Sequence, residues 1–270
     1  MQHPFSILAS EYATLLAAMR LDDDREHELK ARAATVLDLA HDHRFEWADI
    51  EYRTGVPRLW GMASFERESS SDYSRSPAQG DRWDKISVNV PRGLGPYRCW
   101  GDACEAAYAI DKLDEVGKAN WSWARACYEG ELYNGFGPRT HGRHTGYLWS
   151  WTNVYMGGKY VADGKWDPDH RDEQCGMVPM MAVLLKFDAS LALADEFPAA
   201  LILATPDGLK DAAWVQTRLN ALGADPQLVV DGSYGRATRR AVAAFQAAHR
   251  LAPDGLAGPL TIAALNPPVA

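Results

Sequence analysis

The sequence predicts a mainly α-helical fold with a small β element, followed by a small three-helix domain. Three observations support this prediction. Amphipathic helical patterns recur through the first two thirds of the chain, one short segment alternates apolar and other residues, and the C-terminal part contains an internal repeat. The chain has 270 residues, which is long enough for one sizeable core and a second, smaller domain.

The larger, N-terminal part is predicted to contain most of the helices and the β element. Apolar residues at helical spacing predict each helix. The segment KISVNVP, in which Ile86, Val88 and Val90 alternate, predicts a short β element at residues 85–91. The predicted helices span residues 5–19, 23–43, 57–69, 100–116, 119–133 and 175–196.

A junction separates the two parts of the chain. Pro198, Pro206 and Gly208 interrupt the helical pattern, as expected of a connecting segment. We therefore expect a larger domain at residues 1–200, a linker at 201–209 and a smaller helical domain at 210–270.

The C-terminal repeat consists of two Asp-Gly-x-x-Gly-x-x-Thr units, each followed by an apolar helix. They are DGSYGRAT, starting at Asp231, and DGLAGPLT, starting at Asp254. Glycine permits the positive φ of such a turn, and the Thr lies near a helix start, where its hydroxyl can cap free amides. With the helical segment VQTRLNALG, these units resemble the peptidoglycan-binding domain type 1. The resemblance implies a three-helix module that binds the bacterial cell wall.

Composition and charge exclude some classes of function. The net charge is −8, which argues against nucleic-acid binding because that requires a basic face. No apolar run approaches the ~20 residues that a membrane span needs. The chain contains ten Trp residues, and nine of them precede residue 200. Trp faces can stack on sugar rings, so this richness suits a carbohydrate cleft, although the same residues can instead fill a core.

The order of elements around FERESSSDYSRSPAQGD resembles the lysozyme-like superfamily. A helix ends in Glu, a polar loop and Gly-Asp follow, and a β element comes next. Phage-type lysozymes place a Thr six residues after the Asp, and here Ser87 lies six residues after Asp81. The pair Glu68-Ser69 is similar to the Glu-Ser pair of lytic transglycosylases and goose-type lysozymes. This Glu-to-Asp spacing is longer than in phage-type lysozymes, and the GLMQ-like segment of transglycosylases is absent.

Elements further along the chain extend the resemblance over roughly residues 55–185. YNGFG, YLWS, NVY and GKYVADG are similar to a group of phage and prophage lysozyme-like proteins, which also carry the Gly-Asp and Val-Pro-x-Gly elements. The resemblance is therefore to a phage-type endolysin, a lysozyme-like muramidase, with a wall-binding module. It implies cleavage of peptidoglycan between N-acetylmuramic acid and N-acetylglucosamine.

Glycosidic cleavage requires a proton donor and, for hydrolysis, a second carboxylate. We expect Glu68 to be the acid, Asp81 the second carboxylate and Ser87 the holder of the attacking water. Glu66 is the alternative acid. Helical periodicity places Glu66 nearer the apolar face, whereas the Glu-Ser pairing favours Glu68.

Five residues are candidates for binding the sugar. Trp149 and Trp151 alternate, so in an extended segment they would share one face. Glu131 is a further acid, which we expect to close a helix at the surface. The five candidates are Tyr133, Asn134, Tyr147, Trp149 and Trp151.

Other wall-lytic chemistries find little support in the sequence. The histidines lack a His-Glu-x-x-His motif, so we expect no metal and no cofactor. Nothing around Cys104 or Cys127 resembles an activated nucleophile. Three alternatives stay open: a lytic transglycosylase, an enzyme acting on chitin-type substrates, and a non-catalytic wall-binding phage structural protein. We expect a monomer whose partner is peptidoglycan. It would reside in the host cytoplasm before release to the periplasm and wall, because no signal peptide is visible.

Overall fold

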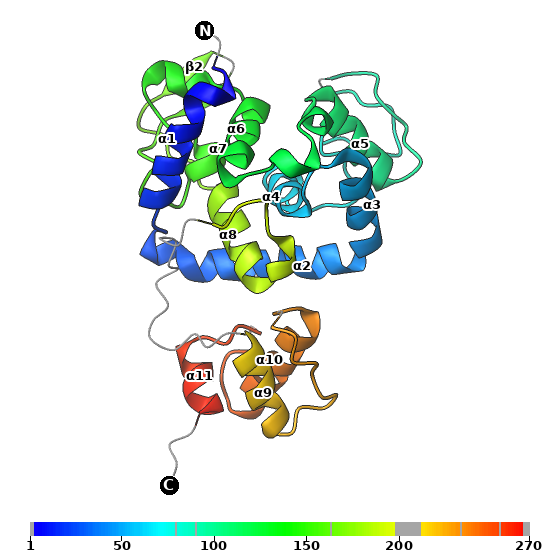
Figure 1. The fold of residues 1–270 in the computed structure, drawn as a ribbon, viewed down its shortest axis with the longest axis vertical. Coiled ribbons are helices and arrows are strands. Elements are labelled where there is room, and N and C mark those ends of the chain that lie inside the picture. The colour runs from blue at the N-terminus through cyan, green and yellow to red at the C-terminus, as the bar shows by residue number, and fades with distance from the viewer. Residues whose placement is uncertain are drawn as a thin grey trace.

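The computed structural model describes residues 3–78, 80–89, 91–162, 164–197, 212–232, 234–253 and 255–266. The described residues are mainly helical and include one small two-stranded sheet, which confirms the predicted mainly α fold. Two hydrophobic clusters form the cores, one N-terminal and one C-terminal. Figure 1 shows the helices of the two parts as separate groups. The predicted linker, residues 201–209, lies outside the described residues.

Eight α-helices of the described chain surround the N-terminal core, and the β-hairpin lies outside that core. Short 3-10 helices connect several of them: η1 (Asp23–Arg25), η2 (Leu113–Glu115), η3 (Lys118–Asn120), η4 (Gly137–His141) and η5 (Ala189–Leu191). The main elements are α1 (Phe5–Ala18), α2 (Glu26–Asp42), α3 (Arg44–Thr54), α4 (Arg58–Ser69), α5 (Trp100–Ile110), α6 (Trp123–Asn134), α7 (Gly146–Trp149), β1 (Lys159–Ala162), β2 (Lys165–Asp167) and α8 (Met177–Phe187).

Helix α4 runs through the middle of this domain (Figure 1). Its residues from Leu59 to Phe65 are all buried, so nearly every face of the helix contacts protein. Gly61 permits the closest contacts. A Cβ at this position would lie 2.5 Å from the Tyr108 hydroxyl and 2.7 Å from the Trp47 ring. The same helix packs on α8, and its last turn carries Glu66, Arg67 and Glu68, of which Glu68 is exposed.

The β element predicted at residues 85–91 is wrong. The described part of that segment is an irregular loop in which Ile86 and Val88 are 62% and 72% exposed. The backbone amides of Val88 and Asn89 donate to the carboxylate of Asp81, at 2.9 and 2.8 Å, instead of pairing with a strand. Alternation alone does not supply a partner strand, whereas a well-placed acceptor satisfies these amides locally. The sheet is instead the antiparallel β1–β2 hairpin.

The predicted helices differ from the structure mainly in four places. Helix α3 lies outside the predicted helices, and the helix predicted at 119–133 begins at Trp123. The helix predicted at 100–116 ends at Ile110, and the one predicted at 175–196 ends at Phe187. In the last two cases the chain continues into the short 3-10 helices η2 and η5. Helix α5 ends before Lys112, which adopts a left-handed backbone with φ 57°.

The C-terminal core contains α9 (Ala212–Ala221), α10 (Arg236–Ala248) and α11 (Pro259–Leu265). Gly232 and Gly255 occupy equivalent turns with φ of 74° and 71°, which confirms the predicted positive φ of both Asp-Gly units. A buried glutamine accepts a hydrogen bond from the glycine amide of each turn. Gln216 accepts from the amide of Gly232 at 3.1 Å, and Gln246 accepts from that of Gly255 at 2.9 Å.

The two threonines of the repeat bond to the same glutamines. The side-chain amide of Gln216 donates to Thr238 at 3.0 Å, and that of Gln246 donates to Thr261 at 3.0 Å. Each repeat unit is thus held by a glutamine that lies outside it in sequence and links its glycine to its threonine.

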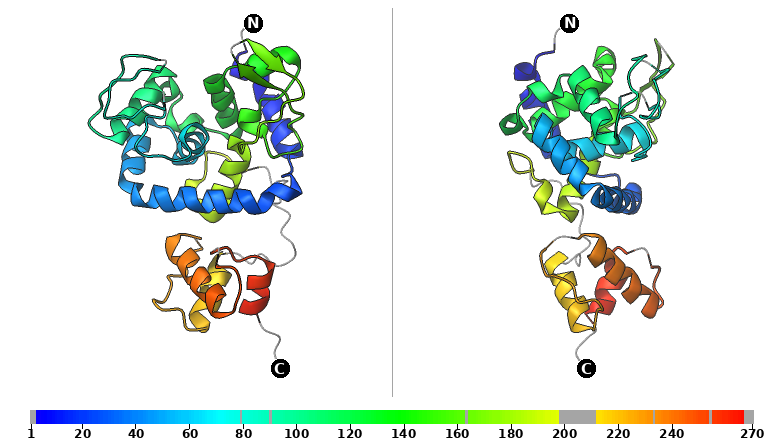
Figure 2. Two further views of the ribbon diagram at one scale, coloured as in Figure 1. Left: turned by 180° about the vertical axis from the view of Figure 1, so that it is seen from behind. Right: turned by 90° about the vertical axis from the view of Figure 1, so that its right-hand side faces the viewer.

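The small domain lies on the α2 side of the large one, as Figures 1 and 2 show from three directions. The amide of Tyr234 donates to the carbonyl of Phe187 at 2.8 Å, and the two rings pack at 5.7 Å. Arg236 pairs with Asp42 of α2 at 2.6 Å. In the described segments, no helix combines the length and apolarity that membrane crossing requires.

Candidate active site

The last turn of α4 presents Glu68 at the surface of the N-terminal core. The helix ends at Ser69, and Ser70 and Ser71 then take left-handed backbone conformations with φ of 54° and 56°. This sharp end stops the helix before its side chains are covered by further chain. The Glu68 carboxyl group therefore lies where a groove can reach it.

The surroundings of Glu68 favour its protonated form. The residue stays accessible to solvent, yet protein occupies most of the space around its carboxyl group. This loss of hydration raises the pKa of Glu68, and the nearby Asp111 raises it further. The hydroxyl of Tyr147, which donates to Glu68 Oε1 at 2.7 Å, and the positive charge of Arg67 oppose the rise without cancelling it.

A cavity of about 310 Å³ opens beside Glu68, and we call it the acid pocket. Asp111, the residue after α5, brings a second carboxyl group to its wall, and burial raises the pKa of that group too. No sequence motif marks Asp111, which falls inside the helix predicted at 100–116 and follows α5 in the structure. The lining residues are Glu68, Ala78, Pro91, Ile110, Asp111, Tyr133 and Asn134.

Glu66 lies on the other side of α4 from this pocket. Its carboxylate accepts from Arg32 of α2 at 2.8 Å and from the hydroxyl of Ser71 at 2.8 Å. Both oxygens are therefore engaged in holding α4 and the following turn to α2. Its side chain is only 12% exposed, so the helical periodicity correctly placed Glu66 nearer the interior.

Three of the five predicted sugar-binding residues gather around Glu68. Tyr133 and Asn134, at the end of α6, line the acid pocket, and Tyr147 of α7 donates to the acid. The rings of Tyr133 and Tyr147 stack with centroids 6.3 Å apart. The Asn134 amide donates to Thr145 at 3.1 Å, which fixes its orientation at the pocket wall.

The two predicted tryptophans lie elsewhere. Trp149 closes α7 and is 1% exposed, and Trp151 is 4% exposed with a left-handed φ of 69°. The segment is thus not extended, and the expectation that the two rings share one exposed face is wrong. The tryptophan richness serves mainly the core. The buried members are Trp47, Trp60, Trp100, Trp121, Trp123, Trp149 and Trp151.

Asp81 and Ser87 hold the loop at residues 81–94 by hydrogen bonds. The Asp81 carboxylate accepts from the amides of Val88 and Asn89 and from the Asn89 side chain, at 2.8–2.9 Å. The Ser87 hydroxyl, which is buried, donates to the carbonyl of Pro91 at 2.9 Å and accepts from the Leu94 amide at 3.0 Å. Among the described residues, neither lines the acid pocket.

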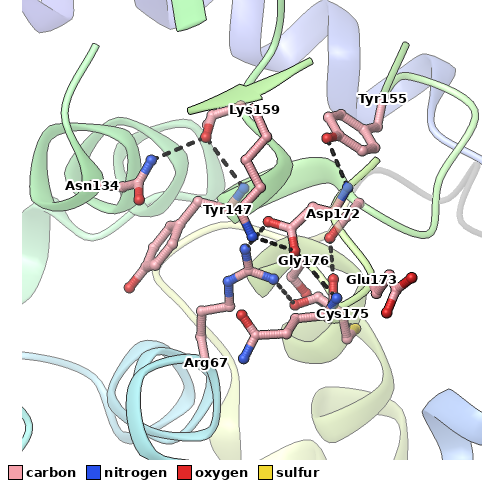
Figure 3. Close-up of polar contacts among 12 residues, drawn as sticks. Arg67, Asn134, Tyr147, Tyr155, Lys159, Asp172, Glu173, Cys175 and Gly176 are labelled. Atoms are coloured by element: carbon pink, nitrogen blue, oxygen red, sulfur yellow. Dashed lines mark hydrogen bonds and ion pairs between the residues drawn. The ribbon is translucent and has the colours of Figure 1, made fainter. Parts of the chain in front are cut away.

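A second cavity of about 320 Å³ lies next to the acid pocket, and we call it the cationic pocket. Arg67 and Lys159 meet the buried carboxylate of Asp172 there (Figure 3). Asn134 lines both cavities, so the two are neighbours across one side chain. The lining residues are Arg67, Asn134, Gly137, Pro138, Thr145, Gly146, Tyr147, Gly158, Lys159, Tyr160 and Asp172.

Glu131 corrects another expectation. It does not close a helix at the surface but is 1% exposed, accepting from the hydroxyl of Tyr12 at 2.6 Å and from Arg139 at 2.8 Å. This buried carboxylate joins α6 to α1 and to η4. Because its partners occupy it and the acid pocket does not include it, Glu131 is part of the scaffold.

The described chain offers few groups for metal or thiol chemistry. No cluster of three or more His, Cys, Asp or Glu able to hold a metal ion occurs in it. Its four cysteines are free thiols, and burial raises the pKa of Cys104, Cys127 and Cys175. A raised pKa disfavours the thiolate that nucleophilic attack requires.

Comparison with known proteins identifies the C-terminal segment. Residues 209–265 match the family described as "Putative peptidoglycan binding domain". The searches of curated proteins and of solved structures found no match. The family match agrees with the resemblance carried by the two Asp-Gly units, and it supports peptidoglycan as a partner of the chain and an association with the cell wall.

Proposed function

We propose that the protein is a peptidoglycan hydrolase that cleaves the glycan strand between N-acetylmuramic acid and N-acetylglucosamine. The observation that carries the proposal is Glu68, a carboxyl group with a raised pKa at the wall of a cavity in a chain with a wall-binding domain. A raised pKa lets the carboxyl group keep its proton to higher pH than an ordinary glutamate, and a glycosidic leaving oxygen requires such a proton. The lysozyme-like resemblance of residues 55–185 supports the same reaction.

Glu68 acts as the general acid in this proposal, and Tyr147 positions it. The Tyr147 hydroxyl fixes one carboxyl oxygen, which leaves the other free to face a substrate in the acid pocket. Tyr133 and Asn134 line the same wall and contact the sugar and its acetamido group. Positioned proton donors of this kind contribute about 10²–10⁴-fold to rate.

Asp111 is the better placed second carboxylate. It lines the acid pocket with Glu68, whereas the oxygens of Asp81 are engaged with the loop at 81–89. In the proposed reaction Asp111 activates water or stabilises the oxocarbenium-like transition state. Asp81 and Ser87 then act indirectly, by holding the loop that carries Pro91 to the pocket wall.

The decisive experiment compares Glu68→Gln with Glu66→Gln on purified sacculi. Gln keeps the size of Glu but cannot donate the proton, so Glu68→Gln is expected to abolish lysis. Glu66→Gln weakens the contact with Arg32 and is expected to lower thermal stability while lysis continues. Circular dichroism verifies folding in both. Loss of lysis in Glu66→Gln alone would assign the acid to Glu66, and full lysis by both variants would remove glycosidic acid catalysis from the proposal.

A lytic transglycosylase is the second candidate, because one carboxylate suffices for it. It forms a 1,6-anhydro end without attack by water. Mass spectrometry of digested murein separates the two reactions, since their products differ by one water. The presence of Asp111 beside Glu68 favours hydrolysis. Digestion of chitin oligosaccharides tests the neutral acetamido-sugar alternative in the same assay.

A non-catalytic wall protein is the third candidate. Such a protein would still bind peptidoglycan through its C-terminal domain, but wild-type protein would never clear sacculi.

We further propose that the enzyme reaches the wall from the host cytoplasm as a monomeric phage-type endolysin. Expression in the cytoplasm with and without a membrane-permeabilising holin tests that route, with lysis expected only in the presence of the holin.

A further inference from the structure

We propose that the cationic pocket is a binding subsite for the carboxylate of an acidic acetamido sugar, with Lys159 as its contact. This inference rests on the proposed glycan cleavage at Glu68 and adds to it the chemistry that selects the substrate. It assigns the acidic sugar to the cationic pocket and its neighbour in the strand to the acid pocket.

The charge balance of the cationic pocket is the first support. Of its lining residues in the described chain, Arg67 and Lys159 are cationic and Asp172 is anionic. Arg67 and Asp172 form a buried ion pair with side chains 6% and 4% exposed. Burial alone would raise the pKa of Asp172, but Arg67 and Lys159 outweigh burial and hold it below the ordinary value, so Asp172 is ionised at neutral pH. The pocket therefore carries one uncompensated positive charge.

Lys159 supplies that charge at the open side of the pocket. Its ammonium group lies 3.2 Å from Asp172 Oδ1, yet its side chain is 39% exposed. An ammonium group has three donors, and a carboxylate oxygen at one of them leaves others available to a ligand. Figure 3 shows Lys159 reaching from β1 toward Asp172, with Arg67 approaching the same carboxylate from α4.

The anchoring of Asp172 preorganises this arrangement. Its backbone amide donates to the Tyr155 hydroxyl at 3.0 Å, and its carboxylate also accepts from the amide of Gln174 at 3.2 Å. Arg67 donates in addition to the carbonyl of Cys175 at 3.1 Å. The carboxylate that orients Lys159 is thus fixed from several sides, so little conformational entropy is lost when a ligand binds.

The cationic pocket lies directly beside the acid pocket and Glu68. Arg67 is the residue before Glu68, Tyr147 lines the cationic pocket while donating to Glu68, and Asn134 lines both cavities. A saccharide that spans the two cavities therefore passes the acid. Its two ends meet different chemistry, since the acid pocket holds two carboxyl groups and the cationic pocket a net positive charge.

The ligand class follows from this asymmetry. An acetamido sugar with a carboxylate fits the cationic pocket, and an uncharged one fits the acid pocket. In peptidoglycan the carboxylate has two sources, the lactyl group of a peptide-free muramic acid and the peptide attached to it. Chitin oligosaccharides carry neither, so they serve as the neutral comparison.

The experiment measures binding in the full chain with the inactivating change Glu68→Gln, so that no substrate is consumed. Amide signals of residues 158–160 are followed by NMR during titration, which separates this site from the wall-binding domain. Three tetrasaccharides are used: chitotetraose, the peptide-free muramic-acid form and the peptide-bearing form. Lys159→Gln removes the charge, and Lys165→Gln, at an exposed lysine of β2 in the same hairpin, is the matched control.

Lys159→Gln is expected to weaken binding of a carboxylate-bearing tetrasaccharide about tenfold, as for loss of one charge-assisted hydrogen bond. Chitotetraose binding and all binding by Lys165→Gln stay unchanged. Weakening of the peptide-free form assigns the lactyl carboxylate, and weakening of the peptide-bearing form alone assigns the peptide. Equal weakening for chitotetraose, or no signal change at 158–160 with either acidic ligand, would overturn the inference.

Failure of the proposed cleavage would look different. If Glu68→Gln still lyses sacculi, the assigned acid is wrong, whatever happens at residues 158–160. If Glu68→Gln is inactive and Lys159→Gln binds acidic and neutral sugars like its parent, the cleavage stands and only the subsite falls.

Discussion

The two domains hold their key polar side chains in different ways. In the C-terminal domain, Gln246 is 2% exposed and its amide bonds to Leu256, Thr261 and Gly255 at 2.8–3.0 Å. In the N-terminal domain, the carboxyl group of Glu68 has a raised pKa and faces a cavity, with a bond from Tyr147 as its side-chain anchor. Gln246 thus uses its polar atoms to stabilise the fold, whereas Glu68 keeps one carboxyl oxygen without a side-chain partner in the described chain.

This difference separates structural from reactive polar groups. A satisfied buried amide stabilises one backbone arrangement and has no capacity left for a ligand. A carboxyl group that has lost part of its hydration and makes no ion pair is harder to ionise than an ordinary one, which is what a proton donor needs. Glu66, with Arg32 and Ser71 on its two oxygens, belongs to the structural class although it lies two residues from Glu68.

The largest expected effect comes from Glu68→Gln. Lysis of sacculi should fall by about 10²–10⁴-fold, because the proton donor is lost. The melting temperature at neutral pH should not fall, since Gln can still accept from Tyr147. Turbidity loss and circular dichroism measure the two quantities. A variant that loses activity only together with its fold would place Glu68 in the structural class.

The second largest expected effect is the loss of stability when a fully hydrogen-bonded, buried amide side chain is removed. Gln246→Ala leaves the Gly255 amide and the Leu256 carbonyl without this partner, and should reduce the stability of the C-terminal domain by about 1–3 kcal/mol. Urea unfolding of the full chain, followed by the NMR amide signals of Gly232 and Gly255, reports on this domain. Gln227→Ala changes an exposed glutamine of the same domain and is the control. Equal midpoints for both variants would contradict the structural role of Gln246.

Asp111→Asn tests the second carboxylate and should reduce turnover about tenfold or more. It also removes a negative charge that helps raise the pKa of Glu68. The alkaline limb of the pH–rate profile, which marks loss of the Glu68 proton, should therefore move to lower pH. Asp81→Asn is the comparison, with impaired loop folding but an unmoved pH limb. The reverse pattern would return the catalytic role to Asp81.

The smallest expected effect is on stability as a function of pH. The pKa of Glu68 is raised in the folded state, so the folded chain holds this proton more tightly than the unfolded chain. Wild-type stability then decreases as pH rises from the ordinary glutamate pKa through the raised one. Glu68→Gln removes that decrease, so its melting temperature should exceed that of wild type at pH 8, with the difference shrinking toward pH 4. A constant difference would argue against the raised pKa.

Local patterns predicted some parts of the protein well and others poorly. The helical nature of both domains, α1, α2 and α4, and the positive φ of Gly232 and Gly255 follow from spacing and turn chemistry. The strand at 85–91 failed because the amides of Val88 and Asn89 found the Asp81 carboxylate, an acceptor that alternation does not reveal. The prediction that Trp149 binds the sugar was wrong, because the burial of its ring depends on the segments that pack over it.

Local sequence patterns are enough to predict the C-terminal repeat, the mainly helical class and the candidate acids Glu66 and Glu68. These features depend on short-range physics: glycine at positive φ, helical periodicity and the end of α4. Long-range packing sets which acid faces a cavity, brings Asp111 beside it and places Lys159 and Arg67 on Asp172. Hydration, charge and partners at these groups come from segments distant in the chain, and no local pattern encodes that convergence.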